Sequence, residues 1–333
     1  MCGILAYFSK TKSLNLEEFI NHLFNLKHRG QDSCGISYIQ NGTIKAHYAE
    51  SIDKLDSKIN ENNYSLLGHV RYITSGGSDI HQPYISSNNF GSYSLIFNGN
   101  IPTNEYDKNF NSDTLMIIDY LNKNSYNHTT WIELLKSFLN NYKKSYSLII
   151  QTNESMFILR DKYGVRPVYY TENLSNNSYL FSSETCIFDS SSFPREIKAG
   201  TLHALNRYGL KKIEEDPAPC QSHCLFEYVY FLNKNSEFEG TNVVNYRNKI
   251  GRVMAQNDKE FENNAELIVC GVPNSGLEYS KTYANELNIH HQESIKKNKN
   301  VFRTFILKND TERNKYAKLK YIFDKNIKGK NIV

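Results

Sequence analysis

The chain lacks the features that mark several large classes of protein. No apolar run is long enough for a signal peptide or a membrane span, since the stretch from Ile4 to Phe8 is far too short for either. The charges nearly cancel, with 39 Lys and Arg against 35 Asp and Glu, which gives no basic footprint for nucleic acid. Six cysteines are scattered without the spacing of a disulfide scaffold. We therefore expect a cytoplasmic protein with no membrane or nucleic-acid partner.

The composition is otherwise that of a folded globular protein. The 333 residues include 39% hydrophobic and 13% aromatic side chains, enough for two domains with cores of their own. Cys220, His223 and Cys224 lie close together in the sequence and could in principle hold a metal ion. No second pair with ligand spacing follows them, so the sequence predicts no metal site there.

The first two-thirds of the chain reads as strands, a few helices and polar loops. Apolar residues recur at helical spacing over residues 15–27, 112–122 and 130–141. Asn41-Gly42 lies between two short β-type runs, which is a strong hairpin signal. Further strands are expected at residues 4–8, 66–72, 93–97, 146–150, 156–160, 168–170 and 179–182. This order fits two antiparallel sheets between helix layers, an α+β arrangement of αββα type.

The pattern changes near Asp216-Pro217-Ala218-Pro219, a rigid and turn-prone segment. Residues 245–256 are expected to be helical, Leu267–Val272 to be a short apolar strand, and residues 277–287 to be helical again. Alternation of helix and strand is typical of α/β architecture with a parallel sheet. The sequence thus predicts one domain over residues 1–216 and a second over residues 217–333.

Cys2 is the residue with the clearest chemical potential. Removal of Met1 would make it the N-terminus, so that one residue carries both a thiol and an α-amine. Ordinary thiols have a pKa of about 8.5 and α-amines of about 8, so near neutral pH such an amine can accept the proton of the thiol. A terminal threonine paired with its own amine is a known variant of this logic.

Other segments supply what the hydrolysis of a carboxamide needs besides a nucleophile and a base, namely an oxyanion site and groups that bind the substrate. Asn98-Gly99 follows an expected strand and offers an amide side chain beside an unhindered N–H. Arg71 ends another strand before a loop that contains Thr74, and Asp113 stands at a helix start. Each segment alone has a structural explanation: Asn-Gly as a turn, Arg71 as an ion-paired surface residue, and Asp113 as a helix cap.

Together, these segments resemble the class II, or N-terminal-nucleophile, glutamine amidotransferases. The motifs that carry the resemblance are Met1-Cys2-Gly3-Ile4, His28-Arg29-Gly30-Gln31-Asp32, Gly68-His69-Val70-Arg71-Tyr72, Gln82-Pro83, Asn98-Gly99-Asn100 and the run from Arg160 to Pro167. The run from Cys224 to Phe231, the run from Gly271 to Gly276 and Arg303-Thr304-Phe305-Ile306 narrow it to the amidophosphoribosyltransferase family. The resemblance covers essentially the whole chain.

The resemblance implies a role for each candidate residue in the first domain. Cys2 would attack the side-chain amide of glutamine and form a thioester, while Asn98 and the Gly99 N–H hold the oxyanion. Arg71 with Thr74 would bind the α-carboxylate of the substrate, and Asp113 its α-ammonium group. Phe97 stands where the family normally has His.

The resemblance also implies a second half-reaction, in which ammonia displaces pyrophosphate from phosphoribosyl pyrophosphate and gives 5-phosphoribosylamine for purine biosynthesis. That site is expected in an α/β type I phosphoribosyltransferase domain, with Lys297 and Arg303 in a flap over it and Mg²⁺ holding the diphosphate. Phe302 replaces a Gly of this flap. No cofactor is implied for the glutaminase domain.

In the family, the second domain continues where this chain ends at Gly329-Lys330-Asn331-Ile332-Val333, into a loop that binds phosphoribosyl pyrophosphate. We therefore expect that domain to be incomplete here, as a fragment, a split gene product or a decayed domain. Cys224 is similar to one ligand of the iron–sulfur cluster of some members, and no cluster is predicted. The resemblance implies a homo-oligomer, or a partner chain that completes the domain.

Three hypotheses remain open from the sequence. The chain is an amidophosphoribosyltransferase-like enzyme, a stand-alone glutaminase that supplies ammonia to a partner, or a catalytically silent homologue that binds glutamine as a regulator. Retention of Cys2, Arg71, Asn98, Gly99 and Asp113 favours the first two, while Phe97 and the missing loop favour the second and third.

Overall fold

The computed structural model describes residues 2–55, 63–72, 80–102, 110, 112–298 and 309–333. It divides into two compact units, residues 1–225 and 226–333. Backbone hydrogen bonds join Ala218 to Lys162 and Ser222 to Tyr163 within the first unit. The assignment of residues 1–216 and 217–333 to two types of domain stays a prediction. Across the described part of the chain, no helix has both the length and the apolar character needed to span a membrane.

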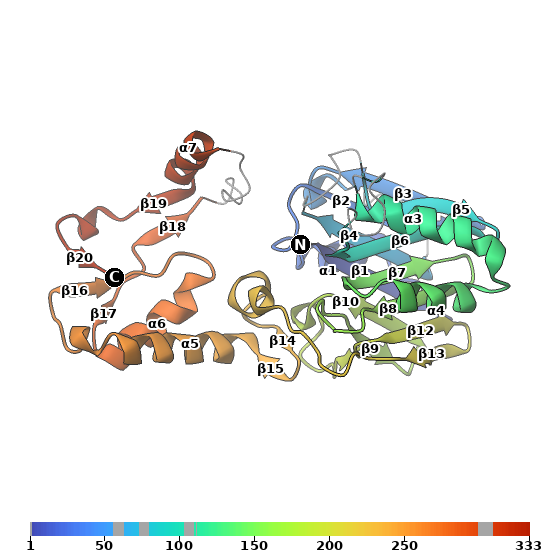
Figure 1. Cartoon of the computed structure of the whole chain (residues 1–333). Helices are drawn as coiled ribbons and strands as arrows, with labels where there is room; N and C mark the ends of the chain where they lie inside the picture. The colour runs from blue at the N-terminus through green and yellow to red at the C-terminus, as the bar shows by residue number, and fades with distance from the viewer. Residues whose placement is uncertain (1, 56–62, 73–79, 103–109, 111, 299–308) are drawn as a thin grey trace. The chain divides into compact units, whose positions relative to one another are not determined.

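The first unit is built on two antiparallel sheets (Figure 1). The seven strands of the larger sheet are, in spatial order, β11 (Arg195–Glu196), β9 (Tyr169–Asn173), β10 (Ser178–Ser182), β1 (Gly3–Ser9), β4 (Ser65–Arg71), β2 (Ser33–Gln40) and β3 (Thr43–Ala49). The six strands of the smaller sheet are β13 (Gly209–Glu215), β12 (Thr201–Asn206), β8 (Ser155–Arg160), β7 (Ser145–Gln151), β6 (Gly91–Asn100) and β5 (Tyr84–Asn88).

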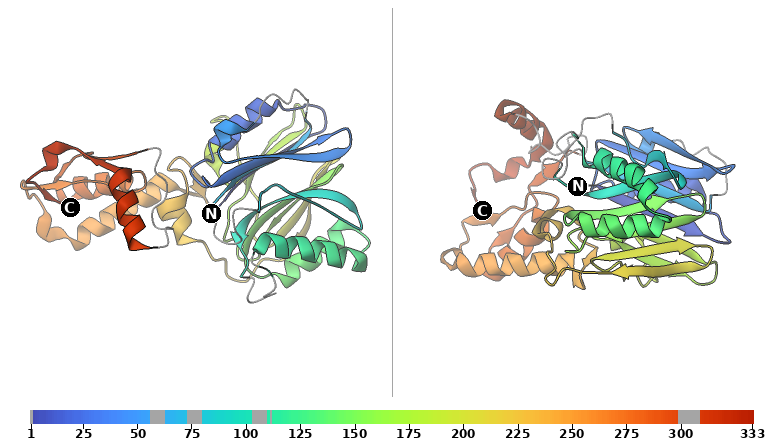
Figure 2. Two further views of the ribbon diagram at one scale, coloured as in Figure 1. Left: turned by 90° about the horizontal axis from the view of Figure 1, so that it is seen from above. Right: turned by 45° about the vertical axis from the view of Figure 1, so that its right-hand side comes forward.

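One helix layer covers the outer face of each sheet, as the view from above shows (Figure 2). Helix α1 (Leu16–Phe24) begins after Asn15, whose side chain accepts a hydrogen bond from the Glu17 N–H, and buries an apolar face against the larger sheet. Helices α3 (Asp113–Asn124) and α4 (Trp131–Asn141) cover the smaller sheet. The expected helices and the order of layers are confirmed.

The alternation of side chains along β1 explains why the two sheets lie face to face. Leu5 and Tyr7 pack under α1, whereas Ile4, Ala6 and Phe8 enter the core between the sheets. Ile96 of β6 and Leu67 of β4 belong to that same inner core. Both faces of these strands are buried, which is why their sequences read as nearly continuous apolar runs.

Asn41-Gly42 forms the predicted hairpin turn between β2 and β3. Both residues have positive φ, 51° and 74°, as a two-residue turn of type I′ requires. The Asn98-Gly99 pair differs from the expectation. It lies inside β6, where Asn98 faces Ser147 and Gly99 faces Tyr146 of β7. Strand β6 is therefore longer than predicted, and this pair is not a turn.

The second unit is a small α/β arrangement. Its central sheet is parallel, with the order β17 (His290–His291), β16 (Leu267–Val269) and β20 (Asn331–Ile332). Helices α5 (Val243–Asn257) and α6 (Gly276–Leu287) pack with it around one apolar cluster. The remaining elements of its described part are a π-helix (Glu227–Phe231), β14 (Glu237–Phe238), β15 (Thr241–Asn242), a 3₁₀-helix (Lys259–Phe261), β18 (Ile295–Lys297), α7 (Asp310–Lys320), β19 (Tyr321–Phe323) and a second 3₁₀-helix (Lys325–Ile327).

The strand expected over Leu267–Val272 is shorter than predicted, because β16 ends at Val269. A Cβ atom on Gly271 would lie 2.2 Å from the Ser280 hydroxyl, so the chain there runs against α6. Pro273, which has no N–H to donate, follows directly. The apolar run thus continues into the turn that leads to α6.

Candidate active site

Cys2 lies at the start of β1, and the period of the strand aims its side chain. Cys2 has the same parity as Ile4, Ala6 and Phe8, which all enter the core between the two sheets. Its thiol lies 3.8 Å from the Tyr72 carbonyl oxygen, just beyond the end of β4. The nucleophile predicted from the sequence is therefore half-buried at the edge of the inter-sheet core.

The same parity brings Asn98 to Cys2 from the opposite sheet. Asn98 is two residues beyond Ile96, an inner-core residue, and is fully buried. Its Oδ1 accepts a hydrogen bond from the Cys2 nitrogen, at 3.2 Å. Its Nδ2 is buried and has no hydrogen-bond partner among the described residues. A buried donor without a partner, on a side chain that contacts the nucleophilic residue, is suited to an oxyanion that forms during a reaction.

Gly99 lies beside Asn98 in a place that accepts no side chain. A Cβ atom there would lie 2.3 Å from the Ser145 carbonyl oxygen and 2.8 Å from the Phe97 ring. Glycine is therefore required by the close approach of β6 and β7. It leaves the backbone of this segment exposed to the pocket, which Gly99 helps to line.

Arg71 is the last residue of β4, and its side chain also points between the two sheets. Leu67, His69 and Arg71 share one parity, so all three side chains point toward the smaller sheet. Arg71 is nearly fully buried, and its Nη1 donates a hydrogen bond to the Ile80 carbonyl oxygen. A guanidinium held in this way presents a planar fork that matches a carboxylate.

Asp113 enters the pocket as the first residue of α3. Its Oδ1 accepts a hydrogen bond from the Thr114 N–H at 2.9 Å, and its Oδ2 accepts one from the Ile101 N–H at 3.5 Å. The carboxylate is buried at a helix N-terminus, where a negative charge is favoured. The N-cap of α3 is Ser112, so the alternative of Asp113 as the helix cap is wrong, and Asp113 instead lines the pocket from the first turn of the helix.

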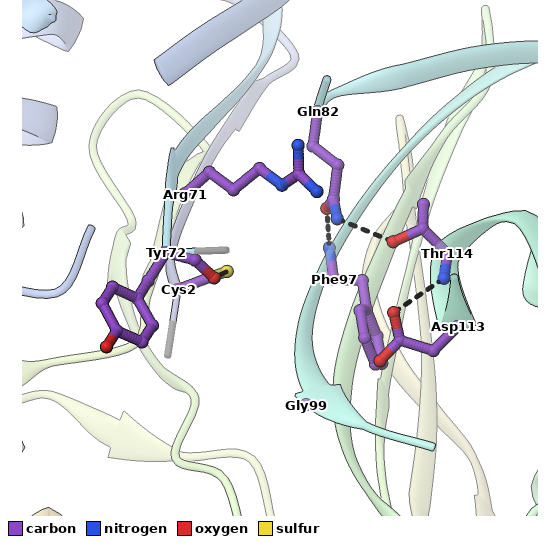
Figure 3. Close-up of a pocket in the computed structure, with 8 residues that line it drawn as sticks. All are labelled: Cys2, Arg71, Tyr72, Gln82, Phe97, Gly99, Asp113 and Thr114. Atoms are coloured by element: carbon purple, nitrogen blue, oxygen red, sulfur yellow. Dashed lines mark hydrogen bonds between the residues drawn. The ribbon is translucent and has the colours of Figure 1, made fainter. Parts of the chain in front are cut away.

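Cys2, Gly99, Arg71 and Asp113 line one pocket, drawn in Figure 3, whereas the fully buried Asn98 is not among its lining residues. Cys2, Arg71 and Tyr72 lie on one side of it, and Phe97, Asp113 and Thr114 on the other. Its volume of about 290 Å³ includes space open to solvent. The residues that line it are Cys2, Arg71, Tyr72, Gln82, Phe97, Gly99, Asp113 and Thr114.

The charges of this pocket suit a small zwitterion. A cationic group on β4 and an anionic group on α3 can bind groups of opposite charge at a fixed separation. Thr74 and Arg303 lie outside the described residues. Lys297 is the last residue of β18, in the second unit. The structure thus brings Cys2, Asn98, Gly99, Arg71 and Asp113 together in the first unit.

Two side chains that occur in the sequence motifs, but to which the sequence analysis gave no role, hold the segment that carries Asn98. The Gln82 Oε1 accepts a hydrogen bond from the Phe97 N–H at 2.7 Å, and the Gln82 Nε2 donates to the Thr114 hydroxyl at 3.0 Å. The His69 Nε2 donates to the Phe97 carbonyl oxygen at 3.2 Å. Both polar groups of the Phe97 backbone are therefore fixed by side chains from outside the sheet of β6.

His69 does this as a neutral imidazole. Burial lowers its pKa to about 3, more than the hydrogen bond to Phe97 raises it, and the nearby Arg71 charge lowers it further. The motif Gly68-His69-Val70-Arg71-Tyr72 was a signal for this residue, and Gln82-Pro83 was a signal for Gln82. Their roles follow only from the contact between the sheets.

Among the described residues, no three His, Cys, Asp or Glu side chains gather closely enough to hold a metal ion. That statement covers Cys220, His223 and Cys224, and the expected lack of a metal site there stays a prediction. The expectation of Mg²⁺ belongs to the phosphoribosyl half of the family reaction and stays a prediction, as does the expected lack of an iron–sulfur cluster.

The sequence is similar to those of several known proteins. A family model described as a glutamine amidotransferase domain matches residues 69–190. The amidophosphoribosyltransferase of Methanocaldococcus jannaschii is 30% identical over 100% of this chain and 77% of its own length. That of Methanothermobacter thermautotrophicus is 30% identical over 96% of this chain and 70% of its own length.

Solved structures agree over nearly the whole chain. Glutamine phosphoribosylpyrophosphate amidotransferase from Bacillus subtilis, solved with ADP and GMP, matches with a TM-score of 0.81 at 27% identity, over 99% of this chain and 74% of that one. A structure titled as the allosteric regulatory enzyme of purine biosynthesis matches with a TM-score of 0.82, also at 27% identity. By these relationships, the chain belongs to the amidophosphoribosyltransferase family and carries its class II glutamine amidotransferase domain.

Proposed function

We propose that this protein hydrolyses the side-chain amide of glutamine through Cys2. The observation that carries the proposal is the geometry of Asn98, whose Oδ1 accepts from the Cys2 nitrogen while its buried Nδ2 has no partner among the described residues. One amide thus contacts the base and offers a donor for the oxyanion. That division of labour is what an N-terminal nucleophile needs.

Removal of Met1 precedes the reaction and turns the Cys2 nitrogen into a primary amine. This amine accepts the proton of the thiol, and the thiolate attacks the amide carbon of glutamine. The tetrahedral intermediate places its negative oxygen between the Asn98 Nδ2 and the Gly99 N–H. The amine returns the proton to the leaving nitrogen, ammonia departs and a thioester remains. Water then cleaves the thioester, releasing glutamate and restoring the thiol.

The substrate is held at its other end by charge. Arg71 binds the α-carboxylate in a bidentate manner, and Asp113 binds the α-ammonium group. Thr74, three residues after Arg71 in the sequence, is proposed to assist it. Phe97 adds an apolar wall to the pocket, where its ring lies beside Asp113 (Figure 3). This wall suits the methylene groups of the glutamine side chain, which lie between the charged end and the amide.

We further propose that the ammonia serves the formation of 5-phosphoribosylamine from phosphoribosyl pyrophosphate, the activity after which the relatives are named. The small parallel sheet of the second unit supports its origin as a type I phosphoribosyltransferase fold. Lys297 is proposed to contribute to a flap over that site, together with Arg303. Pyrophosphate release with ammonia as donor tests this half separately. Assembly with another copy, or with a chain that completes this half, is tested by the mass of the purified complex.

A glutamine analogue that carries a diazoketone in place of the amide tests the glutaminase proposal directly. We expect glutamate release by the full chain, and alkylation of Cys2 in protein that has lost Met1, located by peptide mass spectrometry. Cys220 is exposed and serves as the internal control, because a non-specific reagent would reach it first. Replacement of Cys2 by Ala should abolish turnover, whereas Cys220→Ala should leave it unchanged.

Two results would contradict the proposal. Retained Met1 together with no glutamate release would favour the catalytically silent homologue. Labelling of Cys220 in preference to Cys2 would show that the pocket does not recognise the analogue. Turnover of glutamine without any pyrophosphate release would favour the stand-alone glutaminase and leave the chemistry of Cys2 intact.

A further inference from the structure

A buried ion pair lies directly behind Cys2. The Arg29 Nε donates a hydrogen bond to the Cys2 carbonyl oxygen at 3.0 Å, and its Nη1 donates to Glu184 Oε1 at 2.7 Å. Both side chains are fully buried, at 0% exposure. Arg29 follows the turn after α1, whereas Glu184 lies 155 residues later, just beyond β10. The nucleophile is thus connected to a carboxylate from a distant part of the sequence.

Glu184 gathers further contacts on both of its oxygens. The His28 Nε2 lies 2.7 Å from Oε1, and the Cys186 thiol lies 3.6 Å from Oε2. Burial by itself would raise the pKa of this carboxyl. The charges of His28 and Arg29 outweigh that effect and hold the pKa well below its ordinary range. These contacts favour the ionised form of the Glu184 carboxyl inside the first unit.

The segment that carries Glu184 also fixes the first residues of β1. The Ser183 hydroxyl accepts a hydrogen bond from the Ile4 N–H at 3.0 Å, and the Ser183 N–H donates to the Ile4 carbonyl oxygen at 3.1 Å. With Arg29 on the Cys2 carbonyl, residues 2–4 are held at three points. Chain ends are ordinarily among the least ordered parts of a protein, so this arrangement calls for an explanation.

Fold stability alone explains it poorly. A buried Arg–Glu pair is seldom more stable than well-packed apolar side chains of similar volume, because both charges lose their hydration. The first unit contains a comparable pair, Arg160 with Glu196, whose arginine also binds the Ile197 and Gly164 carbonyl oxygens. Those contacts join a loop to a strand. Of these two ion pairs, only Arg29–Glu184 makes a hydrogen bond to Cys2, the residue that carries the thiol.

We infer that Glu184 is a positioning residue for the nucleophile: it fixes Arg29, which in turn fixes the Cys2 carbonyl and so the placement of the thiol and amine against Asn98. This inference rests on the proposed function of Cys2. His28, the half-buried partner, completes the support by fixing the same carboxylate oxygen from the solvent side. A displacement of about 1 Å at a reacting group can lower a rate by about a hundredfold.

Glu184→Gln in the full chain tests the inference, because it keeps the shape and removes the charge. We expect kcat for glutamine hydrolysis to fall by at least tenfold, while KM changes by less than threefold, since Arg71 and Asp113 still bind the substrate. Hydrogen exchange in the N-terminal peptide should become at least tenfold faster. Glu196→Gln is the matched control, a buried carboxylate paired with arginine, and should leave kcat and this exchange unchanged.

The double variant Arg29→Met with Glu184→Met separates positioning from folding. It removes both buried charges together, so we expect the thermal midpoint lost in Glu184→Gln to recover. The kcat should stay low and the N-terminal peptide should still exchange fast, because nothing then fixes the Cys2 carbonyl. Recovery of kcat to the parent value would overturn the inference, and so would an unchanged kcat in Glu184→Gln.

The exchange readout keeps this test distinct from the proposed function. If the parent protein hydrolyses no glutamine, the function of Cys2 fails. Faster exchange of residues 2–9 in Glu184→Gln, but not in Glu196→Gln, would still show that Glu184 fixes the chain end. Equal exchange in both variants would exclude that role, whatever the activity.

Discussion

The two units of this chain differ in how completely they bury their apolar side chains. Among the residues that the structure describes, the first unit has three buried clusters, one between the sheets and one under each helix layer, and its central strands are five to ten residues long. The described part of the second unit has one small cluster around α5 and α6, and its central strands are two or three residues long. Large apolar side chains stay exposed there, including Val253, Met254, Leu319, Ile322, Phe323 and Ile332.

The difference bears directly on catalysis. The groups proposed for glutamine hydrolysis stand at the ends of long, doubly covered strands or at the start of a packed helix. Rigid elements of this kind hold reacting groups more precisely than short strands or loops. The comparison teaches that the chemistry of the first unit can depend on its own core alone, and each prediction below tests that independence.

The largest expected effect is the loss of stability of the first unit in acid. His69 is fully buried with a pKa of about 3, against an ordinary value of 6.5. Between these values the unfolded chain binds a proton that the folded chain does not, so stability falls as the pH falls from 6.5 toward 3. A displacement of that size corresponds to about 4–5 kcal/mol. The lowered pKa of Glu184 adds to the loss in the same direction, below the ordinary pKa of a carboxyl.

Because the sequence contains a single tryptophan, the pH dependence of unfolding can be measured for the first unit alone. Trp131 packs against Phe90 and Tyr93 within the first unit, so its fluorescence during urea unfolding reports that unit alone. The free energy of unfolding should depend less on pH between 6.5 and 4 in His69→Gln than in the parent. His47→Gln, which removes a histidine that is not fully buried, is the control. The same pH dependence in the parent and both variants would contradict the assignment.

Replacement of Asn98 should give the next largest effect, on the rate of the reaction. Asn98→Ala removes the buried Nδ2 donor, and the loss of one such donor typically costs about 2.7–4 kcal/mol, or 10² to 10³ in kcat. Asn98→Asp keeps an oxygen toward the Cys2 nitrogen but places a negative charge beside the oxyanion, so it should lose at least as much. Steady-state glutamate release measures both variants.

Asn100→Ala is the matched control for these variants, because Asn100 is exposed two residues further along β6. It should keep the kcat of the parent. An Asn98→Ala variant that stays within threefold of the parent would remove the oxyanion role. The hydrogen bond to the Cys2 nitrogen would then be the remaining role of Asn98.

The sequence pointed to these residues through the motifs that resemble the class II glutamine amidotransferases, and the roles assigned to them stay predictions. The structure adds that the alternation of side chains along β1, β4 and β6 places Cys2, Arg71 and Asn98 on the faces toward the core between the sheets. The Asn41-Gly42 turn and the faces of α1 and α4 were also predictable, because they depend on neighbours a few residues apart.

What the sequence could not supply are contacts between residues far apart in the chain. Arg29 and Glu184 are separated by 155 residues, and neither a strand period nor a helix period connects them. The hydrogen bond from His69 to Phe97 depends on how the two sheets face each other. The extent of β6 was also missed, because its pairing with β7 keeps Asn98-Gly99 in the strand although the local signal favours a turn.

Truncation of a buried side chain in the second unit should have a smaller effect on stability, and this effect should be confined to the second unit. Leu287 packs with Val269 and Tyr283 in its single cluster. Leu287→Ala should cost about 2–3 kcal/mol, in the lower part of the usual range, because a small cluster with exposed surroundings can collapse around the gap. Hydrogen exchange by mass spectrometry should show faster exchange over α5 and α6, with unchanged glutamine hydrolysis.

Leu121→Ala is the counterpart in the first unit, where Leu121 of α3 is fully buried. This variant should lower the Trp131 unfolding midpoint, whereas Leu287→Ala should not. If Leu287→Ala reduced glutamine hydrolysis as strongly as Leu121→Ala, the two units would be energetically coupled and the comparison between them would have to be abandoned.

The smallest effect is expected where the second unit leaves apolar side chains in water. Ile322 on β19 is 58% exposed, so Ile322→Ser removes little buried surface and should change the free energy of unfolding by less than about 0.5 kcal/mol. Ile4→Ser, at a fully buried position of β1, is the opposite case and should lose several kcal/mol, since it leaves a cavity and an unpaired hydroxyl. Urea unfolding of both variants measures the contrast. A cost above 1 kcal/mol for Ile322→Ser would mean that something covers this strand in solution, and the apparent difference between the units would then belong to the isolated chain rather than to the working protein.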